Sequence, residues 1–234
     1  MNYSCNKNKI KKISNALKEQ NEQNQKKGGI VPLPIYEEGQ SLTAIKVVPS
    51  AGIDPVTGNE IFIKRDGSYT MTYDANDKVI FGDSTPFGIG SLSSYLTYKQ
   101  FSLGTSFRYS FGGSIYNQTL ATKVEGSDPR YNADERVFND RWKQPGDIAK
   151  YKKISDSSVP QQTSRFIQTN NYITLSSLSL AYEVPAEKLK KFGLRRLHLE
   201  MIANDLFYWS TAKRERGLSY PYDRSIEFSA RFSL

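Results

Sequence analysis

Few residues in this chain are able to carry chemistry, and each has a simpler structural interpretation. His198 is the only histidine, so a Ser-His-Asp triad or a zinc site would have to be built around one ring. Asp74, Asn76 and Asp77 resemble the start of a calcium loop, but its glycine at the sixth position and glutamate at the twelfth are missing. The sequence therefore predicts a polar turn there, a polar strand position for His198, and no catalytic residue, metal site or cofactor.

Two aromatic residues, Tyr131 and Trp142, are the candidates for substrate binding. Both lie in the longest segment between two predicted strands, and their flat rings are suited to stacking on sugar rings. The same rings are equally suited to packing a loop against itself or against a partner protein. The sequence alone leaves these two interpretations open.

The elements that position these residues are long alternating strands. Segment 226–234 has an apolar side chain at every even position and a polar one at every odd position. Segment 101–111 alternates over its whole length, with aromatic residues, leucine and one threonine at the odd positions. Soluble strands usually span about five or six residues, whereas a tilted strand crosses a bilayer with about 9–11 residues. Both segments predict membrane-crossing strands, and a soluble β-sandwich is the alternative.

Three further segments, 88–98, 171–184 and 194–208, repeat this alternation less regularly. In 171–184 the phase changes at Ser176 and Ser177, which predicts a β-bulge. In 194–208 the phase would place His198 with its polar neighbours, opposite the leucines.

The connections between these strands differ in length. Residues 99–100 form a tight turn, and 185–193 is a short turn with one helical turn that ends at Gly193. The connections 112–165 and 211–221 are longer. Short turns on one side and long loops on the other are typical of outer-membrane barrels, with the long loops outside the cell.

Composition and charge exclude other classes of protein. The chain contains no run of about 18 apolar residues, so only strands could cross a membrane. A single cysteine, Cys5, permits no internal disulfide. The net charge of +8 comes mainly from 1–27 and 187–196. Because the aromatic residues lie in the strands and not among those basic residues, the sequence does not predict nucleic-acid binding.

Several short runs, in this order and spacing, resemble the SusC/RagA family of TonB-linked outer-membrane transporters, from about residue 8 to the C-terminus. These runs are KIKKISNALKEQN at 9–21, GIDPVTGNE at 52–60, YSFGG at 109–113, RW at 141–142, PGD at 145–147, TSRF at 163–166, NDLF at 204–207 and ERGLSYP at 215–221.

The resemblance implies an all-β chain that forms the C-terminal portion of a transmembrane antiparallel β-barrel with long extracellular loops. About five strands of a barrel of about 22 strands are expected. Residues 1–87 would hold the end of a preceding strand and an extracellular loop region, and 88–234 the C-terminal strands. We further expect open edges at 88–98, without a preceding neighbour, and at 226–234.

The implied function is import of a large nutrient across the outer membrane of a Gram-negative bacterium. The expected partners are a SusD-like surface lipoprotein, the TonB complex through an N-terminal part that this chain lacks, outer-membrane lipid, and a glycan or peptide ligand. Because no plug, TonB-contacting segment or signal peptide is visible, we expect a fragment of a longer protein and no enzyme activity. The alternatives are a surface binding or adhesion protein without transport, and a soluble β-sandwich carbohydrate-binding module.

Overall fold

The chain forms two compact units in the computed structural model, which describes residues 1–128, 130–131, 133–215 and 224–233. The first, here called the sheet unit, comprises Met1–Asn6, Pro86–Gly112 and Asn170–Leu234. The second, here called the loop unit, comprises Lys7–Thr85 and Gly113–Thr169. The chain therefore leaves the sheet unit twice and returns to it twice.

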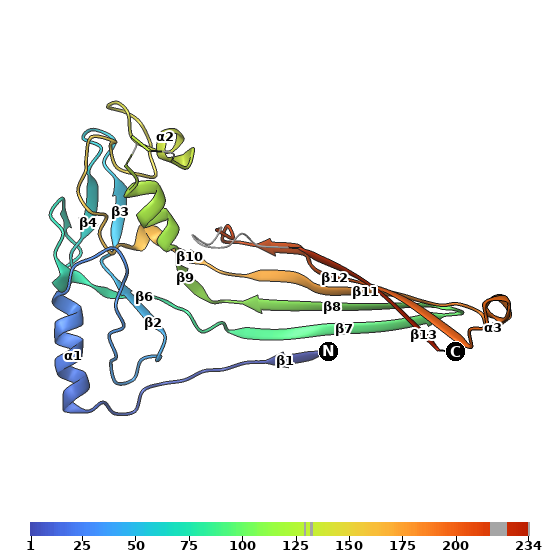
Figure 1. Ribbon diagram of the computed structural model, residues 1–234. Coiled ribbons are helices and arrows are strands. Elements are labelled where there is room, and N and C mark those ends of the chain that lie inside the picture. The colour runs from blue at the N-terminus through green and yellow to red at the C-terminus, as the bar shows by residue number, and fades with distance from the viewer. Residues whose placement is uncertain (129, 132, 216–223, 234) are drawn as a thin grey trace. The chain divides into compact units, whose positions relative to one another are not determined.

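The sheet unit is a six-stranded antiparallel sheet whose long strands lie side by side (Figure 1). The strand order is β1 (Asn2–Ser4), β7 (Gly88–Tyr98), β8 (Phe101–Phe111), β11 (Tyr172–Glu183), β12 (Arg196–Ser210) and β13 (Ser225–Ser233). All five strands expected from the sequence are present, with ends that differ by at most two residues from the expected ones. Leu234 and most of the run 215–221 lie outside the described residues.

The register of the sheet gathers the apolar side chains on one face. Leu103 pairs with Leu180, Leu180 pairs with Met201, and Met201 pairs with Phe228. Directly paired residues project to the same side of an antiparallel sheet. The apolar face, as this set is called below, consists of Leu92, Leu96, Tyr98, Phe101, Leu103, Phe107, Tyr109, Phe111, Ile173, Leu175, Leu178, Leu180, Tyr182, Leu197, Leu199, Met201, Ala203, Phe207, Trp209, Ile226, Phe228, Ala230 and Phe232.

Two adjacent β-bulges keep this face continuous where the phase of the sequence changes. Leu175 pairs with Phe107 and Ser177 pairs with Ser106, so Ser176 is an extra residue opposite β8, and the predicted bulge is confirmed. The Ser176 hydroxyl donates a hydrogen bond to the Ser106 carbonyl, 2.9 Å away. On β12, two residues, Asp205 and Leu206, lie opposite Ser176. Asp205 has a φ of 52°. The apolar residues therefore stay on one face on both sides of the bulges.

The expectation that segment 88–98 has no preceding neighbour is wrong for the start of β7. Strand β1 pairs there, with Tyr3 opposite Gly90. The glycines of β7 leave room for two tyrosines, because a Cβ at Gly88 would lie 2.6 Å from the ring of Tyr3, and one at Gly90 would meet the ring of Tyr109. The Tyr109 hydroxyl donates to the Asn2 carbonyl at 2.8 Å. Aromatic rings thus cover the backbone where β1 and β7 meet.

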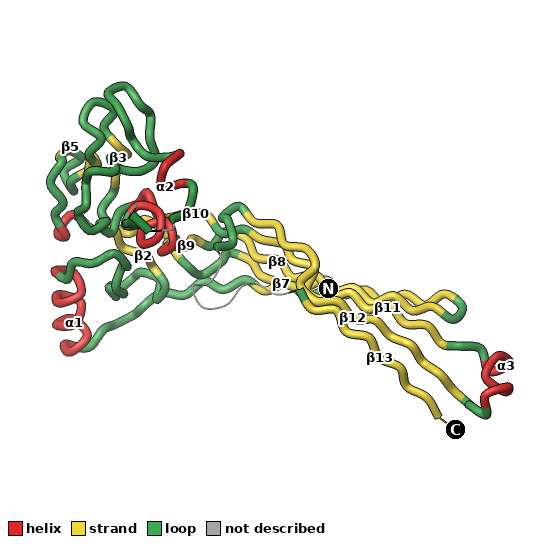
Figure 2. The backbone as a smooth tube through the Cα atoms, turned by 45° about the horizontal axis from the view of Figure 1, so that its top comes forward, coloured by secondary structure: helices red, strands yellow, loops and turns green. Residues whose placement is uncertain are grey.

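The short turns of the sheet unit match the sequence expectation. Lys99, at the turn between β7 and β8, has a φ of 54°. The connection from β11 to β12 contains α3 (Ala186–Leu189, red in Figure 2) and η4 (Lys190–Phe192), and it ends at Gly193 with a φ of 69°. A left-handed glycine at this position is a common helix terminator.

The loop unit combines small sheets with short helices. Its strands are β2 (Ala44–Val47) with β6 (Val79–Asp83), then β3 (Ser50–Ile53), β4 (Glu60–Ile63) and β5 (Tyr69–Thr70), and finally β9 (Ser114–Tyr116) with β10 (Ile167–Thr169). Its helices are α1 (Asn15–Lys26), η1 (Ala75–Asp77), the π-helix η2 (Leu120–Glu125), α2 (Arg136–Asn139) and η3 (Ser164–Phe166). The hydrophobic core joins Leu120, Ala121, Val124, Val137, Tyr151 and Phe166.

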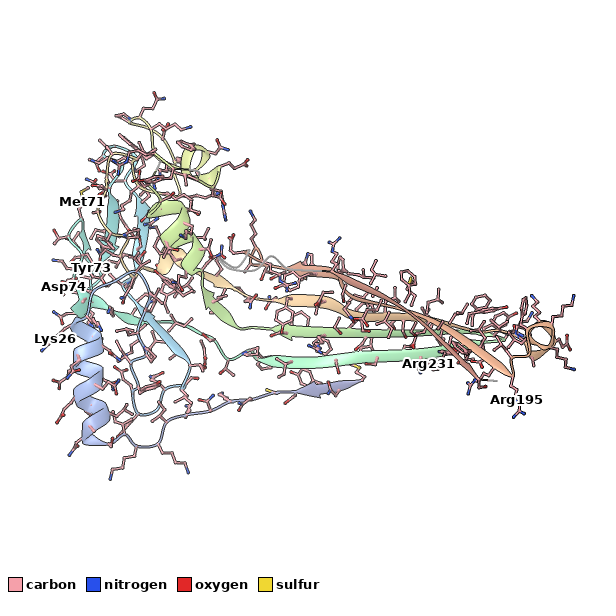
Figure 3. All side chains as sticks on the ribbon, in the orientation of Figure 1. Lys26, Met71, Tyr73, Asp74, Arg195 and Arg231 are labelled. Carbon is pink, nitrogen blue, oxygen red and sulfur yellow. The ribbon has the colours of Figure 1, made fainter. Side chains whose placement is uncertain are left out.

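Helix α1 is an addition to the all-β expectation. The Ser14 hydroxyl caps its N-terminus by accepting from the Leu17 amide, and none of its residues is buried. Side-chain amides hold it instead: Asn21 bonds both backbone groups of Tyr36, and Gln25 donates to the Ala75 carbonyl at 2.6 Å. Figure 3 marks its last residue, Lys26, with Tyr73 and Asp74 close by. No helix in the described ranges is long and apolar enough to cross a membrane.

The left-handed conformation of Asp205 in the β12 bulge predicts how substitutions there change the free energy of unfolding. Replacing Asp205 with valine should lower the free energy of unfolding by about 1–2 kcal/mol, because a β-branched residue is disfavoured in the left-handed region. Replacing Asp205 with glycine, which adopts this conformation readily, should have a much smaller effect. Denaturant unfolding of both variants measures the difference, and equal losses would contradict the role assigned to the bulge.

Candidate functional site

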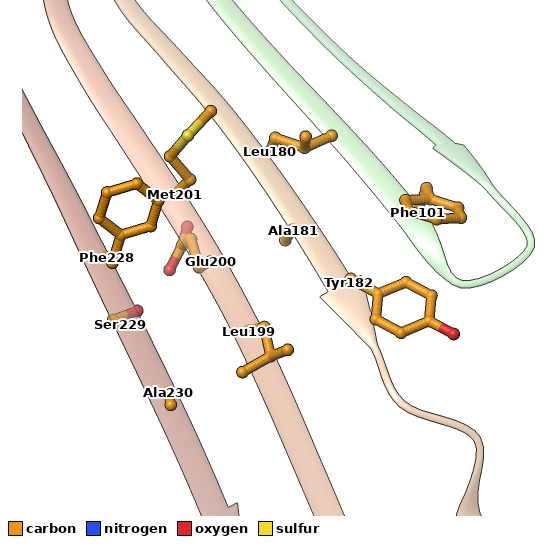
Figure 4. A pocket seen from close by; sticks show the side chains of 10 residues that line it. All are labelled: Phe101, Leu180, Ala181, Tyr182, Leu199, Glu200, Met201, Phe228, Ser229 and Ala230. Carbon is orange, nitrogen blue, oxygen red and sulfur yellow. The ribbon is translucent and has the colours of Figure 1, made fainter.

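The apolar face of the sheet unit exposes large side chains along its whole length. Phe228 is 79% exposed and Leu96 is 62% exposed. Figure 4 shows part of this face, a shallow hollow of about 370 Å³ where Leu180 and Met201 lie near Phe228. Soluble monomers rarely expose apolar patches larger than a few hundred Å². A continuous face of this kind needs an apolar environment to cover it.

The opposite face of the same sheet is polar. Its hydroxyls pair across strands, as with Ser93 and Ser106 at 3.1 Å. His198 lies on this face, as the sequence predicted, with Nδ1 2.9 Å from Glu183 Oε2 and Nε2 3.9 Å from Glu200 Oε2. Arginines share both carboxylates, because Arg196 pairs with Glu183 and Arg231 pairs with Glu200. His198 therefore lies beside two arginine–glutamate ion pairs on the polar face.

The acidic run at 74–77 forms the polar turn that the sequence predicted. Asp74 caps η1 by accepting from the Asn76 amide at 2.8 Å, and Asp77 accepts from the Arg65 amide at 3.1 Å. The carboxylates are thus bound to separate backbone groups. Among the described residues, no three His, Cys, Asp or Glu side chains are placed to hold a metal ion.

Trp142 packs against the turn that follows β3. Its indole N–H donates to the Pro55 carbonyl at 2.9 Å. A Cβ at Gly58, which has a φ of 72°, would lie 2.5 Å from the Trp142 ring. The turn is itself held by Asp54, and the hydrogen bond from the Thr57 hydroxyl is the main cause that lowers the pKa of this carboxyl. Trp142 is therefore an anchor for the GIDPVTG run.

The same indole also lines a surface pocket of about 460 Å³ in the loop unit, together with the exposed side chains of Phe138 and Ile154. Tyr131 is 73% exposed and is not among the residues that line this pocket. The structure thus brings one of the two candidate residues to a concave surface. Binding of a substrate by Tyr131 or Trp142 stays a prediction.

A buried ion network, which the sequence analysis did not predict, organises the loop unit. The Arg165 guanidinium binds both carboxylate oxygens of Glu60 at 2.7 Å and the Glu125 carboxylate at 2.8 and 2.9 Å. All three side chains are buried or nearly so. Burial alone would lower the pKa of Arg165, but the two glutamates outweigh it and raise this pKa above the ordinary value. Arg165 therefore stays charged and cross-links β4, η2 and η3.

A second buried arginine, Arg141, binds backbone carbonyls rather than carboxylates. Its guanidinium donates to the carbonyls of Val124, at 3.0 Å, and of Glu125. Nearby, the Tyr151 ring packs in the hydrophobic core, and burial raises its pKa to about 12. Arg141 and Tyr151 thus add to the contacts that hold the loop unit together.

Comparison with known proteins gives related sequences and solved structures of similar fold. No family model matches it. TonB-dependent receptor P39 of Formosa agariphila is 27% identical over 157 residues, or 65% of this chain, and TonB-dependent receptor P3 of the same organism is 29% identical over 164 residues, or 67% of this chain. The chain is thus similar to TonB-dependent receptors. The predicted resemblance to TonB-linked outer-membrane proteins is thereby confirmed. The chain spans only 15% of the length of each of these two receptors.

Solved structures agree with this chain in fold. The RagAB peptide importer in its open-open state matches 88% of the chain with a TM-score of 0.68 and 21% identity. The RagAB peptide transporter matches 79% with a TM-score of 0.64 and 20% identity. The chain covers 22% and 21% of those chains. Likeness at this level of identity shows a shared fold.

The ion network of the loop unit predicts a large loss of stability when Arg165, its cation, is removed. Replacing Arg165 with methionine should cost about 3–5 kcal/mol, because two buried carboxylates lose their partner. Replacing Arg130 with methionine is the matched control, since Arg130 pairs with Asp128 on the surface and should cost at most about 1 kcal/mol. Fluorescence of Trp142 in a Trp209→Phe background follows unfolding of the loop unit, and similar losses in both variants would contradict the role of Arg165.

Proposed function

We propose that the chain is part of a TonB-dependent transporter in the outer membrane of a Gram-negative bacterium, where it forms barrel strands. The observation that carries this proposal is the register of the sheet unit, which places apolar residues from all its long strands on one face. Lipid acyl chains would cover this face, and the polar face would line the lumen. The named TonB-dependent receptors among its relatives support the same assignment.

The dimensions of the strands agree with this assignment. Strands β7 and β8 each contain 11 residues, and β12 contains 15, whereas about 9–11 residues suffice for a tilted crossing. Backbone hydrogen bonds in the bilayer core have to be satisfied between strands, and the antiparallel pairing of β7 to β13 does this for the internal strands. The sheet would therefore be one arc of a closed barrel, for which about 22 strands is the family expectation.

The proposed transport substrate is a large nutrient, an oligosaccharide or a peptide, with energy supplied through TonB. A peptide is supported by the matching solved structures, which are described as a peptide transporter and a peptide importer. In this proposal the loop unit is extracellular, a SusD-like lipoprotein covers the loops, and Tyr131 and Trp142 are candidates for contact with the substrate. The proposed division remains 1–87, with the end of a preceding strand and a loop region, and 88–234, with the C-terminal strands and the second segment of the loop unit between them. No enzyme activity is proposed.

The assignment of faces predicts unequal effects of arginine at neighbouring positions of β8. In the assembled transporter, replacing Phe107 with arginine should lower the free energy of unfolding by about 2–4 kcal/mol, since a cation would face the middle of the bilayer. Replacing Ser106 with arginine should cost far less, because this residue lies on the polar face beside Ser93. Unfolding in lipid bilayers measures both values, and equal penalties would mean that the faces are wrongly assigned.

The proposed orientation is testable by labelling of whole cells. Ser157 is exposed in the loop unit, and Cys5 is the only native cysteine. A Ser157→Cys variant in a Cys5→Ser background should react with a membrane-impermeant thiol reagent on intact cells, because the long loops are placed outside. The Cys5→Ser protein is the unlabelled control. Labelling only after the outer membrane is opened would reverse the orientation.

A further inference from the structure

One end of the sheet unit carries exposed basic residues on adjacent turns. Lys99 lies in the turn between β7 and β8, and the Glu183 amide donates to the Gln100 carbonyl at 2.9 Å, which places this turn beside the end of β11. The Arg195 amide donates to the Ser233 carbonyl at 2.9 Å, beside the end of β13, and Arg195 is marked at this end in Figure 3. The basic rim, as this set is called below, consists of Lys99, Lys188, Lys190, Lys191 and Arg195.

The cations of the basic rim are available for binding. All five are exposed, and in the part of the chain that the structure describes none of them forms an ion pair with a carboxylate. Glu183, at the end of β11, is engaged by Arg196 and His198. The connection after it contributes one acid, Glu187, against the four rim cations that follow. The rim therefore presents an excess of positive charge.

Exposed aromatic rings lie beside these cations. Phe192 is 75% exposed between Lys191 and Gly193, and Tyr98 is 71% exposed next to Lys99, whose ammonium lies 5.3 Å from the centre of the Tyr98 ring. The Phe101 ring packs against Tyr182 at this end of the apolar face, with the ring centres 4.7 Å apart. Aromatic rings combined with lysine and arginine are typical of the boundary between acyl chains and lipid headgroups.

We propose that the basic rim binds the phosphate groups of anionic glycerophospholipids at the edge of the bilayer. This inference rests on the proposed function, in which the adjoining apolar face lies in the membrane. Clustered lysine and arginine next to a membrane-embedded surface attract anionic headgroups. Short turns of outer-membrane barrels face the periplasm, and the turns that carry the rim are the short ones, so the lipid is a phospholipid of the periplasmic leaflet.

Native mass spectrometry of the assembled transporter, released from bilayers of phosphatidylcholine, phosphatidylglycerol and lipid A, tests the rim. The wild-type protein should retain phosphatidylglycerol preferentially. The triple variant Lys188→Ser, Lys190→Ser, Lys191→Ser should retain it at least about tenfold less. The matched control replaces Lys11, Lys12 and Lys18 with serine, which removes the same charge from exposed positions of the loop unit. This control should behave like the wild type, and heat-modifiable gel mobility should show that all three proteins are folded.

The outcomes separate this inference from the proposed function. Equal retention of phosphatidylglycerol by the wild type and the rim variant would overturn the inference, while flotation of the wild type with vesicles at high salt would still support the membrane assignment. Preferential retention of lipid A over phosphatidylglycerol would overturn the choice of leaflet. Failure of the wild type to float with vesicles of this composition would overturn the proposed function and the inference together.

Discussion

The pairing register of the long strands is the constraint on which the sheet unit depends. A slip of one residue between two strands would move every side chain of one strand to the other face. The bulges at Ser176 and Asp205 prevent such a change where the sequence itself changes phase. One continuous apolar surface and one surface of hydroxyls and ion pairs result. The proposed membrane position and the lipid contacts at the basic rim both follow from this separation.

The loop unit follows a different principle, because its small hydrophobic core is combined with buried charges. Arg165 connects Glu60, which is 105 residues away in the chain, with Glu125, which is 40 residues away. Trp142 adds a second cross-link to the turn at Gly58. Such contacts give a defined shape to segments that contain few long strands or helices. A rigid set of loops is a suitable support for binding residues.

The strands could be predicted from the sequence because alternation with a period of two is a local signal. Even the bulge was visible, as a change of phase at Ser176. Helix α1 was missed because it lacks a buried face and depends on amide contacts to Tyr36 and Ala75, which are distant in sequence. The partners of Arg165 were missed for the same reason, although Arg165 and Glu60 both lie in runs that resemble the family. Local sequence patterns predict individual strands, whereas contacts between residues that are distant in sequence become visible only in the folded structure.

The paired bulges also restrict how the lengths of neighbouring strands can change during evolution. Strand β11 has one residue more than β8 in the paired region, and β12 has one more than β11. Deleting Ser176 alone would turn Leu175 and Ile173 toward the polar side, and deleting Asp205 alone would do the same to Phe207 and Trp209. Insertions and deletions in these strands should therefore occur in compensating sets among homologues. A change in the length of one strand should therefore be accompanied by a change in the length of the strand paired with it.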